Sequence, residues 1–272
     1  MCTLYSGKSD SLHLSELRIV LLGYRTAGKS SSGNTILGRE EFDTVGKTAQ
    51  CVKRQGQVAG RQVTVVEAPG WWLNFQLEVT PDLTKNEIEL SVSLCPPGPH
   101  ALLLVIRVDK SFTETHRRSL HEHLELLSER VWSHSIVLFT WGDLLGDTPI
   151  EQHIESEGES LQWLVEKCGN RYHVLNNQKR EDHMQVTQLM EKIEEMMARN
   201  NGHHYEIERQ RIEILEDKRR RDEERVKERM MKVKTERETL TKFTIVIFLT
   251  CPSIHNLLCG LSKHLMSYCL YS

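Results

Sequence analysis

Residues 23–30 read GYRTAGKS and come directly after the apolar run LRIVLL at residues 17–22. They match the Walker A pattern, GxxxxGK followed by Ser or Thr, in which a loop between a strand and a helix wraps a phosphate chain with backbone N–H groups. In such a loop Gly28 allows close approach of the backbone, Lys29 reaches the terminal phosphates and the Ser30 hydroxyl ligates Mg²⁺. The N-terminal end of the following helix also attracts phosphate. The motif therefore predicts an α/β domain of the P-loop class.

The motif opens a segment in which short β-type runs alternate with helical patterns. The predicted strands are residues 17–22, 62–67, 101–107, 135–140 and 172–176, and the predicted helices are 30–37, 113–131, 149–168 and 182–197. In the second helix Leu120, Leu124 and Leu127 recur at intervals of three and four residues, which places them on one face. The runs LRIVLL and ALLLVIR are almost continuously apolar, as is typical of strands covered on both sides. We therefore expect a mostly parallel central sheet with helices on both faces.

The pattern changes after residue 202. In residues 203–242 acidic and basic side chains alternate almost without a break, which predicts a long charged helix. A weak coiled coil stays open as an alternative, although Arg219 and Glu223 fall where a coiled-coil seam requires apolar residues. Residues 243–272 form an apolar segment, of which 243–262 contain no Lys, Arg, Asp or Glu. Twenty such residues just reach the thickness of a bilayer, so membrane anchor and packing segment remain two open interpretations.

Composition restricts the compartment and the partners. The net charge is −3 and no strong basic patch is present, which argues against a nucleic-acid binder. The seven cysteines include no CxxC pair, so we expect thiols in a reducing compartment. Residues 1–16 lack a signal-peptide pattern and are expected to be a flexible tail. These features predict a cytoplasmic protein, with attachment of residues 243–272 to the cytosolic face of an intracellular membrane as the open alternative.

A more specific similarity lies in residues 23–38, GYRTAGKSSSGNTILG, and in residues 97–106, PGPHALLLVI. These stretches resemble the GTPases of the immunity-associated protein family, the IMAP or AIG type of septin-like P-loop GTPase. The resemblance covers about residues 17–198 and implies a G domain at 17–202 that binds GTP or GDP with Mg²⁺. The phosphate-binding residues that it implies are Gly23, Tyr24, Arg25, Thr26, Ala27, Gly28, Lys29, Ser30, Ser31 and Gly70.

The resemblance also implies two switch segments. In the family a strand ends in Asp-x-Pro-Gly, where the Asp reaches Mg²⁺ through water and the Gly amide contacts the γ-phosphate. Here the second switch has Glu67, Pro69 and Gly70, and the glutamate is one methylene longer than the family's aspartate. Thr48 matches the first-switch threonine, which would ligate Mg²⁺ together with Ser30. A simple turn at Pro69 and Gly70 is the alternative.

The base-reading motif of the family resembles residues 140–143, TWGD. The Asp143 carboxylate would accept hydrogen bonds from N1 and N2 of guanine, which adenine does not offer. Gly142 replaces the lysine that commonly precedes this aspartate, so one wall of the base site is lost or comes from Trp141. A strand-end turn capped by Asp143 is the alternative. The guanine-binding residues implied by the resemblance are Thr140, Asp143, Asn176 and Asn177.

Hydrolysis requires a positioned water and stabilised charge on the γ-phosphate. Trp71 and Trp72 stand where many GTPases hold a water-orienting glutamine, so we expect slow or absent intrinsic GTP hydrolysis. Two adjacent tryptophans on a switch also suggest an interface, and GTP-bound members of the family often form homodimers or oligomers. Arg25 either supplies charge to the site or is a solvated side chain. The leading hypothesis is a GTP-binding switch that self-assembles at a membrane or with immune-signalling partners. An active NTPase enzyme and a nucleotide-dead interaction module are the alternatives.

Overall fold

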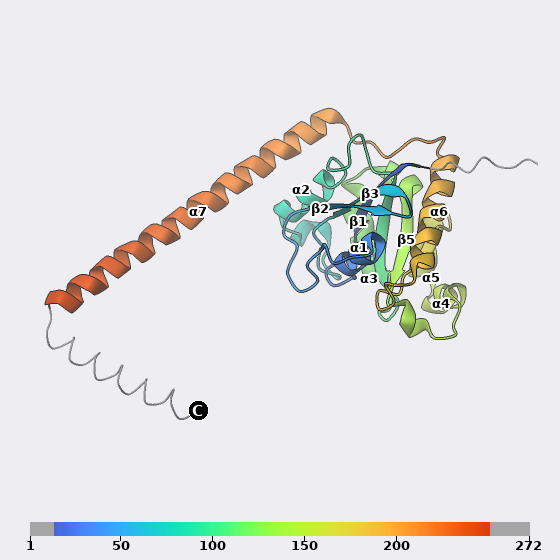
Figure 1. The fold of residues 1–272 in the computed structure, drawn as a ribbon, viewed down its shortest axis with the longest axis horizontal. Helices are drawn as coiled ribbons and strands as arrows, with labels where there is room; N and C mark the ends of the chain where they lie inside the picture. Colours follow the sequence, from blue (N-terminus) through green and yellow to red (C-terminus); the bar gives the residue numbers. More distant parts are fainter. Residues whose placement is uncertain (1–13, 251–272) are drawn as a thin grey trace, which may run out of the picture. The chain divides into compact units, whose positions relative to one another are not determined.

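The computed structural model describes residues 14–250 and contains a six-stranded sheet in the order β2-β3-β1-β4-β5-β6 (Figure 1). The strands are β1 (Glu16–Leu22), β2 (Val52–Val58), β3 (Arg61–Glu67), β4 (Ala101–Arg107), β5 (Ser135–Thr140) and β6 (Tyr172–Val174). All neighbouring pairs are parallel except β2 with β3, which run antiparallel. The mostly parallel sheet expected from the sequence is therefore confirmed.

A helix follows every strand along the chain except β2, as is typical of a doubly wound α/β domain. The helices are α1 (Lys29–Leu37), α2 (Asp82–Leu90), α3 (Glu114–Glu125), α4 (Ile150–Glu157), α5 (Glu159–Lys167), α6 (His183–Arg199) and α7 (Arg209–Thr250). Two predicted helices are shorter than expected. The helix expected at 113–131 ends before Ser128, which has a φ of 71°, and the one expected at 149–168 is divided at Gly158, which has a φ of 88°.

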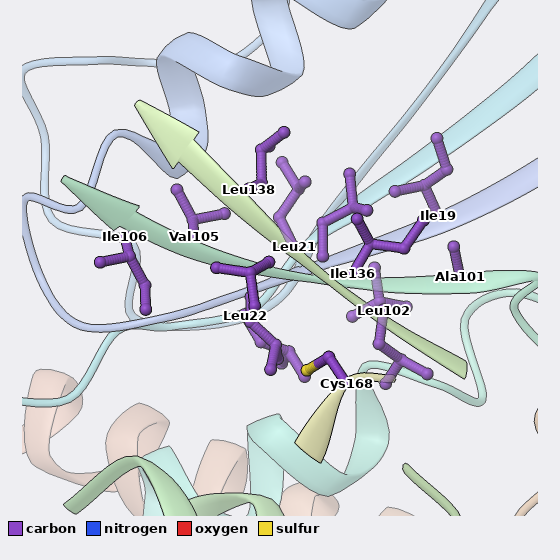
Figure 2. Close-up of a cluster of buried hydrophobic side chains, with 14 of the residues drawn as sticks. Ile19, Leu21, Leu22, Ala101, Leu102, Val105, Ile106, Ile136, Leu138 and Cys168 are labelled. Carbon is purple, nitrogen blue, oxygen red and sulfur yellow. The ribbon is translucent and has the colours of Figure 1, made fainter. Parts of the chain in front are cut away.

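The core is built around the three central strands. Successive residues of β1, β4 and β5 are buried, so both faces of these strands are covered. Figure 2 shows side chains of all three strands together with Cys168, which follows α5. Full burial of one aliphatic side chain contributes about 1.5–3 kcal/mol to folding. This packing fixes the carboxyl ends of the strands, from which the loops of the candidate site emerge.

The described chain divides into two compact units, one extending to Lys218 and the other beginning at Arg219. In the first unit Tyr205 is buried, its backbone N–H donates to the Pro99 carbonyl, and Arg211 on α7 pairs with Glu89. In the second unit α7 is a charged helix that exposes Val226, Met230 and Leu240, among others. The predicted charged helix is thus confirmed, although it begins at Arg209 and continues to Thr250, past the expected end at residue 242.

Neither end of the chain is described. The flexible N-terminal tail expected at 1–16 lies mostly outside the described residues, as does the apolar segment expected at 243–272 beyond residue 250. Within residues 14–250, no helix combines the length and apolar character that a membrane crossing requires.

Candidate nucleotide-binding site

A cavity of about 530 Å³ opens at the carboxyl ends of the parallel strands. Loops that follow β1, β3, β5 and β6 reach it, as does Arg107 at the end of β4, which is the usual position of a ligand site in a doubly wound sheet. The sequence-predicted residues that line it are Arg25, Thr26, Gly28, Lys29, Ser30, Ser31, Thr48, Glu67, Gly70, Asp143 and Asn177. The predicted residues that do not line it are Gly23, Tyr24, Ala27, Pro69, Thr140 and Asn176.

The phosphate loop joins β1 to α1 in a conformation that favours glycine at two positions. Gly23 has a φ of 149° and Gly28 a φ of 98°. A Cβ at Gly23 would lie 2.6 Å from the Val105 carbonyl oxygen, so the loop passes too close to β4 for any side chain. Thr140 lies beneath the loop, where its hydroxyl donates to the Ala27 carbonyl at 2.7 Å. The structure thus gives Thr140 a contact with the phosphate loop.

Lys29 is the buried cation of the loop. Its side chain is buried, and Nζ donates to the carbonyls of Gly23 at 3.2 Å and Tyr24 at 3.0 Å. Burial lowers the pKa of Lys29 to about 8, against the opposing effect of the Glu67 carboxylate. An ammonium held among carbonyl oxygens at the N-terminus of a helix can bind a phosphate group.

Three oxygen-bearing side chains meet beside Lys29. The Ser30 hydroxyl donates to Glu67 Oε1 at 2.8 Å, and the Thr48 hydroxyl donates to the same atom at 3.4 Å. Glu67 is almost fully buried, and this burial raises the pKa of its carboxyl group above the usual value, while Lys29 opposes the rise. Hydroxyl and carboxylate oxygens are the ligands that Mg²⁺ prefers. These residues therefore fit the ion that the resemblance implies.

The second switch packs directly on the phosphate loop. A Cβ at Gly70 would lie 2.6 Å from Lys29 Nζ and 2.7 Å from the Arg25 nitrogen. The Arg25 N–H donates to the Trp71 carbonyl at 2.7 Å, and Arg25 Nε donates to the Gly70 carbonyl at 3.1 Å. The Arg25 guanidinium also lies 4.5 Å from the centre of the Trp72 ring. Arg25 is thus tied to the switch and is not a freely solvated side chain.

The side chains of the two adjacent tryptophans lie in different surroundings. Trp71 is only 3% exposed and stacks on His123, with ring centres 4.4 Å apart. Trp72 is 49% exposed and lines the cavity. The expectation that both residues form an interface is therefore wrong for Trp71, because its ring fills the core beneath the switch.

The base-reading motif follows β5. Asp143 is exposed at the cavity, within a short 3-10 helix, Gly142–Leu145. A Cβ at Gly142 would lie 2.5 Å from Cγ1 of Val174, so a larger residue there requires Val174 to move. Trp141 lines the cavity with Arg107, whose guanidinium lies 4.6 Å from its ring centre. The sequence had offered Trp141 as one wall of the base site, whereas Arg107 was not among the sequence-predicted site residues.

The two predicted asparagines are held by different partners. Asn177 lines the cavity, and its Oδ1 accepts a hydrogen bond of 2.8 Å from Thr35 on α1. The Asn176 N–H donates to the Gln185 side chain at 2.9 Å, which fixes the loop to α6. Gln178 and Arg180 on the same loop also line the cavity and were missed, because the motif gave no pattern beyond residue 177.

The sequence of this chain is similar to those of known proteins. The model of the AIG1 family matches residues 17–226. GTPase IMAP family member 8 of Rattus norvegicus is 32% identical over 208 residues, which cover 74% of this chain and 29% of that protein. Immune-associated nucleotide-binding protein 9 of Arabidopsis thaliana is 33% identical over 201 residues, which cover 70% of this chain and 58% of that protein. The chain thus spans less than two thirds of the length of either relative.

The fold is similar to that of solved structures at low sequence identity. Toc33 from Arabidopsis thaliana, solved in complex with GDP and Mg²⁺, is 14% identical with a TM-score of 0.57, covering 72% of this chain and 89% of that one. A second structure, described as showing that dimerization is important for the GTPase activity of atToc33 and psToc159, gives a TM-score of 0.53 at 14% identity, covering 67% and 83%.

Proposed function

The chain belongs to the AIG1 family and carries an IMAP-type G domain, and we propose on this basis that it is a GTP-binding switch that uses Mg²⁺. One observation carries the proposal. A single cavity brings together the Lys29 ammonium, the Ser30 and Glu67 oxygens and the Asp143 carboxylate. These groups supply a phosphate contact, a magnesium site and an acceptor for the guanine edge. In the complex, Ser30, Thr48 and Glu67 would hold Mg²⁺, which would neutralise charge on the phosphates.

The nucleotide is tested by calorimetric titration of the full chain with GTP, GDP and ATP in the presence of Mg²⁺. We expect GTP and GDP to bind and ATP to bind far more weakly, because adenine lacks the N1–H and N2 amine that would donate hydrogen bonds to the Asp143 carboxylate. Comparable affinity for ATP would favour the NTPase alternative. Absence of binding by all three nucleotides would favour the interaction module.

A substitution at the base contact sharpens this test. Asp143→Asn replaces one acceptor oxygen with an amide donor, so the variant should lose GTP and gain xanthosine triphosphate, whose C2 carbonyl accepts from that amide. Asp147→Asn is the matched control, because Asp147 is exposed on the same loop and does not line the cavity. Equal loss of GTP in both variants would contradict the assignment of Asp143.

We further propose that hydrolysis is slow. Trp72 lines the cavity two residues after Gly70, and its indole N–H only donates, so Trp72 offers no acceptor to orient the O–H of an attacking water. Arg25 is engaged with Gly70 and Trp72, so its charge lies at the switch. Single-turnover measurement of phosphate release by the monomer tests this step. A hydrolysis rate of several per second would contradict it.

Self-assembly with GTP bound is a second part of the proposal. Val45 is 94% exposed and Trp72 is 49% exposed. Both line the cavity, so a bound nucleotide would change their contacts. Light scattering of the full chain with a non-hydrolysable GTP analogue should show a dimer or larger species that GDP does not support. The double substitution Val45→Ser and Trp72→Ser should abolish that species while nucleotide binding persists.

The location of the protein is also a proposal. A cytosolic protein with residues 243–272 attached to the cytosolic face of an intracellular membrane is consistent with the apolar composition of that segment. Vesicle flotation tests it, with the full chain expected to float and a chain ending at residue 242 expected to remain in the soluble fraction. Equal behaviour of the two chains would contradict an anchor in this segment.

A further inference from the structure

Arg25, the third residue of the phosphate loop, contacts three consecutive residues of the second switch. Its backbone N–H donates to the Trp71 carbonyl at 2.7 Å, and its side-chain Nε donates to the Gly70 carbonyl at 3.1 Å. Its guanidinium lies 4.5 Å from the centre of the Trp72 ring. One residue of the loop thus holds the switch both by its backbone and by its side chain.

The side-chain part of this contact depends on arginine. A planar guanidinium can donate from Nε in its own plane while its face lies on an aromatic ring, whereas the ammonium of a lysine is a point charge without a face. Arg25 is half-buried, so both side-chain contacts are partly shielded from water. The backbone N–H would donate to the Trp71 carbonyl from any residue except proline. Substitution of Arg25 therefore removes two of the three contacts and leaves the third.

The far side of the switch is anchored independently of the phosphate loop. Trp71 is buried and stacks on His123 of α3, with ring centres 4.4 Å apart. Nε2 of the same histidine lies 2.9 Å from the Thr80 hydroxyl, at the end of the segment that follows the tryptophan. The chain after Trp71 is thus fixed to α3, and Gly70 is the residue on which Arg25 acts.

Gly70 lies between these two supports, directly against Lys29. A Cβ at Gly70 would be 2.6 Å from Lys29 Nζ, so the switch backbone passes in contact with the buried cation of the phosphate loop. In the proposed GTP complex, Lys29 reaches the terminal phosphates and the Gly70 amide contacts the γ-phosphate. Arg25 therefore fixes the position of an amide that only a triphosphate uses.

We propose that Arg25 is a positioning residue that holds the second switch closed beside Lys29, and that this closure sets the preference of the chain for GTP over GDP. The inference rests on the proposed function and adds to it a regulatory element of the same site. A switch that is closed before the ligand arrives loses less conformational freedom when the γ-phosphate binds the Gly70 amide. GDP makes no such contact, so closure raises the affinity for GTP more than the affinity for GDP.

The experiment compares GDP with a non-hydrolysable GTP analogue. Both are titrated with Mg²⁺ into the full chain and its variants, at concentrations at which light scattering shows a monomer. Arg25→Ala should lower the ratio of analogue affinity to GDP affinity about fivefold or more. Arg25→Lys keeps the positive charge but not the planar group, so it should lower the ratio as well. The inference is overturned if Arg25→Ala keeps the original ratio, or if Arg25→Lys restores it, because charge alone would then explain the effect.

Arg107→Ala is the matched control. Arg107 also lines the cavity and lies 4.6 Å from the centre of a tryptophan ring, that of Trp141. Its side-chain hydrogen bonds go to Asp109 and to the Thr26 carbonyl, which lie outside the second switch. The control variant should lower both affinities by a similar factor and keep the ratio. An equal fall of the ratio in Arg107→Ala and Arg25→Ala would assign the effect to the charge of the cavity and overturn the inference.

Hydrogen exchange gives a second readout that requires no nucleotide. The amide at position 25 donates to the Trp71 carbonyl when the switch is closed, so its protection factor measures closure. Arg25→Ala and Arg25→Lys should lower this protection, whereas Arg107→Ala should keep it. Equal protection in the original chain and all three variants would overturn the inference. Absence of nucleotide binding by the original chain would instead overturn the proposed function, while the exchange data would still show whether Arg25 holds the switch closed.

Discussion

The Ser30 hydroxyl lies 2.8 Å from Oε1 of Glu67 and donates a hydrogen bond to it, although the two residues are 37 positions apart in the chain. Ser30 is the second residue of α1, the helix that follows the phosphate loop, and Glu67 ends β3. The aspartate that the family pattern has at this position would be one methylene shorter. The glutamate therefore reaches the hydroxyl directly and places a carboxylate at the proposed magnesium site.

Glu67→Ala should lower the affinity of the nucleotide complex for Mg²⁺ about tenfold, because a nearby carboxylate is the main negative charge that the protein offers the cation. The Mg²⁺ affinity of Glu67→Asp should lie between those of the original chain and Glu67→Ala. The measurement is a Mg²⁺ titration of GDP release from the full chain. Glu129→Ala serves as the control, since Glu129 pairs with Lys167 and does not line the cavity. An unchanged Mg²⁺ dependence in Glu67→Ala would remove Glu67 from the metal site.

Gly70→Ala should prevent the second switch from closing on the phosphate loop. The added methyl group would lie 2.6 Å from Lys29 Nζ and 2.7 Å from the Arg25 nitrogen, and the second of these is backbone that cannot move freely. We expect a loss of stability of about 1–3 kcal/mol from this overpacking. We also expect a reduced preference for GTP over GDP, measured by competition binding.

The control for Gly70→Ala is Gly60→Ala. Gly60 has a φ of 77° and nothing within 4 Å of an added Cβ, so its substitution adds backbone strain without a collision. Gly60→Ala should therefore cost stability without changing the ratio of GTP to GDP affinity. A Gly70→Ala variant with the original ratio would show that the switch does not act through this contact.

Much of the sheet was predictable because its central strands are buried on both sides. The runs at 101–107 and 135–140 match β4 and β5 at both ends, since continuous apolar sequence is a strong signal for a covered parallel strand. The edge strand β2 was missed. Its sequence VKRQGQV is mostly polar and contains a glycine, and its pairing with β3 depends on the antiparallel register rather than on a hydrophobic pattern.

The site was predictable where a motif fixes spacing and less so where distant segments meet. The phosphate loop was located from eight residues, because wrapping phosphate requires backbone geometry that few sequences adopt. The contact between Arg25 and the Gly70 carbonyl joins residues 45 positions apart, and no local pattern encodes it. The pairing of Arg107 with Trp141 has the same origin, since only the sheet register places the ends of β4 and β5 side by side.

Arg211→Ala should lower the free energy of unfolding by about 2 kcal/mol, because it leaves a buried carboxylate without its charged partner. Glu89 is only 2% exposed, and the Arg211 nitrogens donate to both of its oxygens at 2.6 and 2.8 Å. Urea unfolding followed by tryptophan fluorescence measures the change. Arg209→Ala is the control, since the exposed pair of Arg209 with Glu213 should contribute little. Adding Glu89→Gln to Arg211→Ala should recover part of the loss, which a general packing defect would not allow.

The affinity for GDP should fall as the pH rises above about 8, because the pKa of Lys29 is lowered to about 8 by burial. A bound phosphate favours the charged ammonium, so the pKa of Lys29 is higher in the complex than in the free protein. Below the free-protein value both states carry the proton and the affinity is flat. Above it, binding must take up a proton, and the affinity should be about tenfold lower at pH 9 than at pH 7.

Calorimetry in buffers of different ionisation enthalpy measures this proton uptake directly. Lys29→Ala should bind GDP weakly and without this pH dependence, whereas Lys167→Ala should keep the original profile, since Lys167 pairs with Glu129 outside the cavity.

The stability of the free protein should change with pH in the direction opposite to the GDP affinity. The unfolded chain holds the Lys29 proton up to the ordinary pKa of 10.5, so the free energy of unfolding should rise with pH between about 8 and that value. A GDP affinity that stays flat up to pH 9 would mean that the buried ammonium keeps its proton without a ligand.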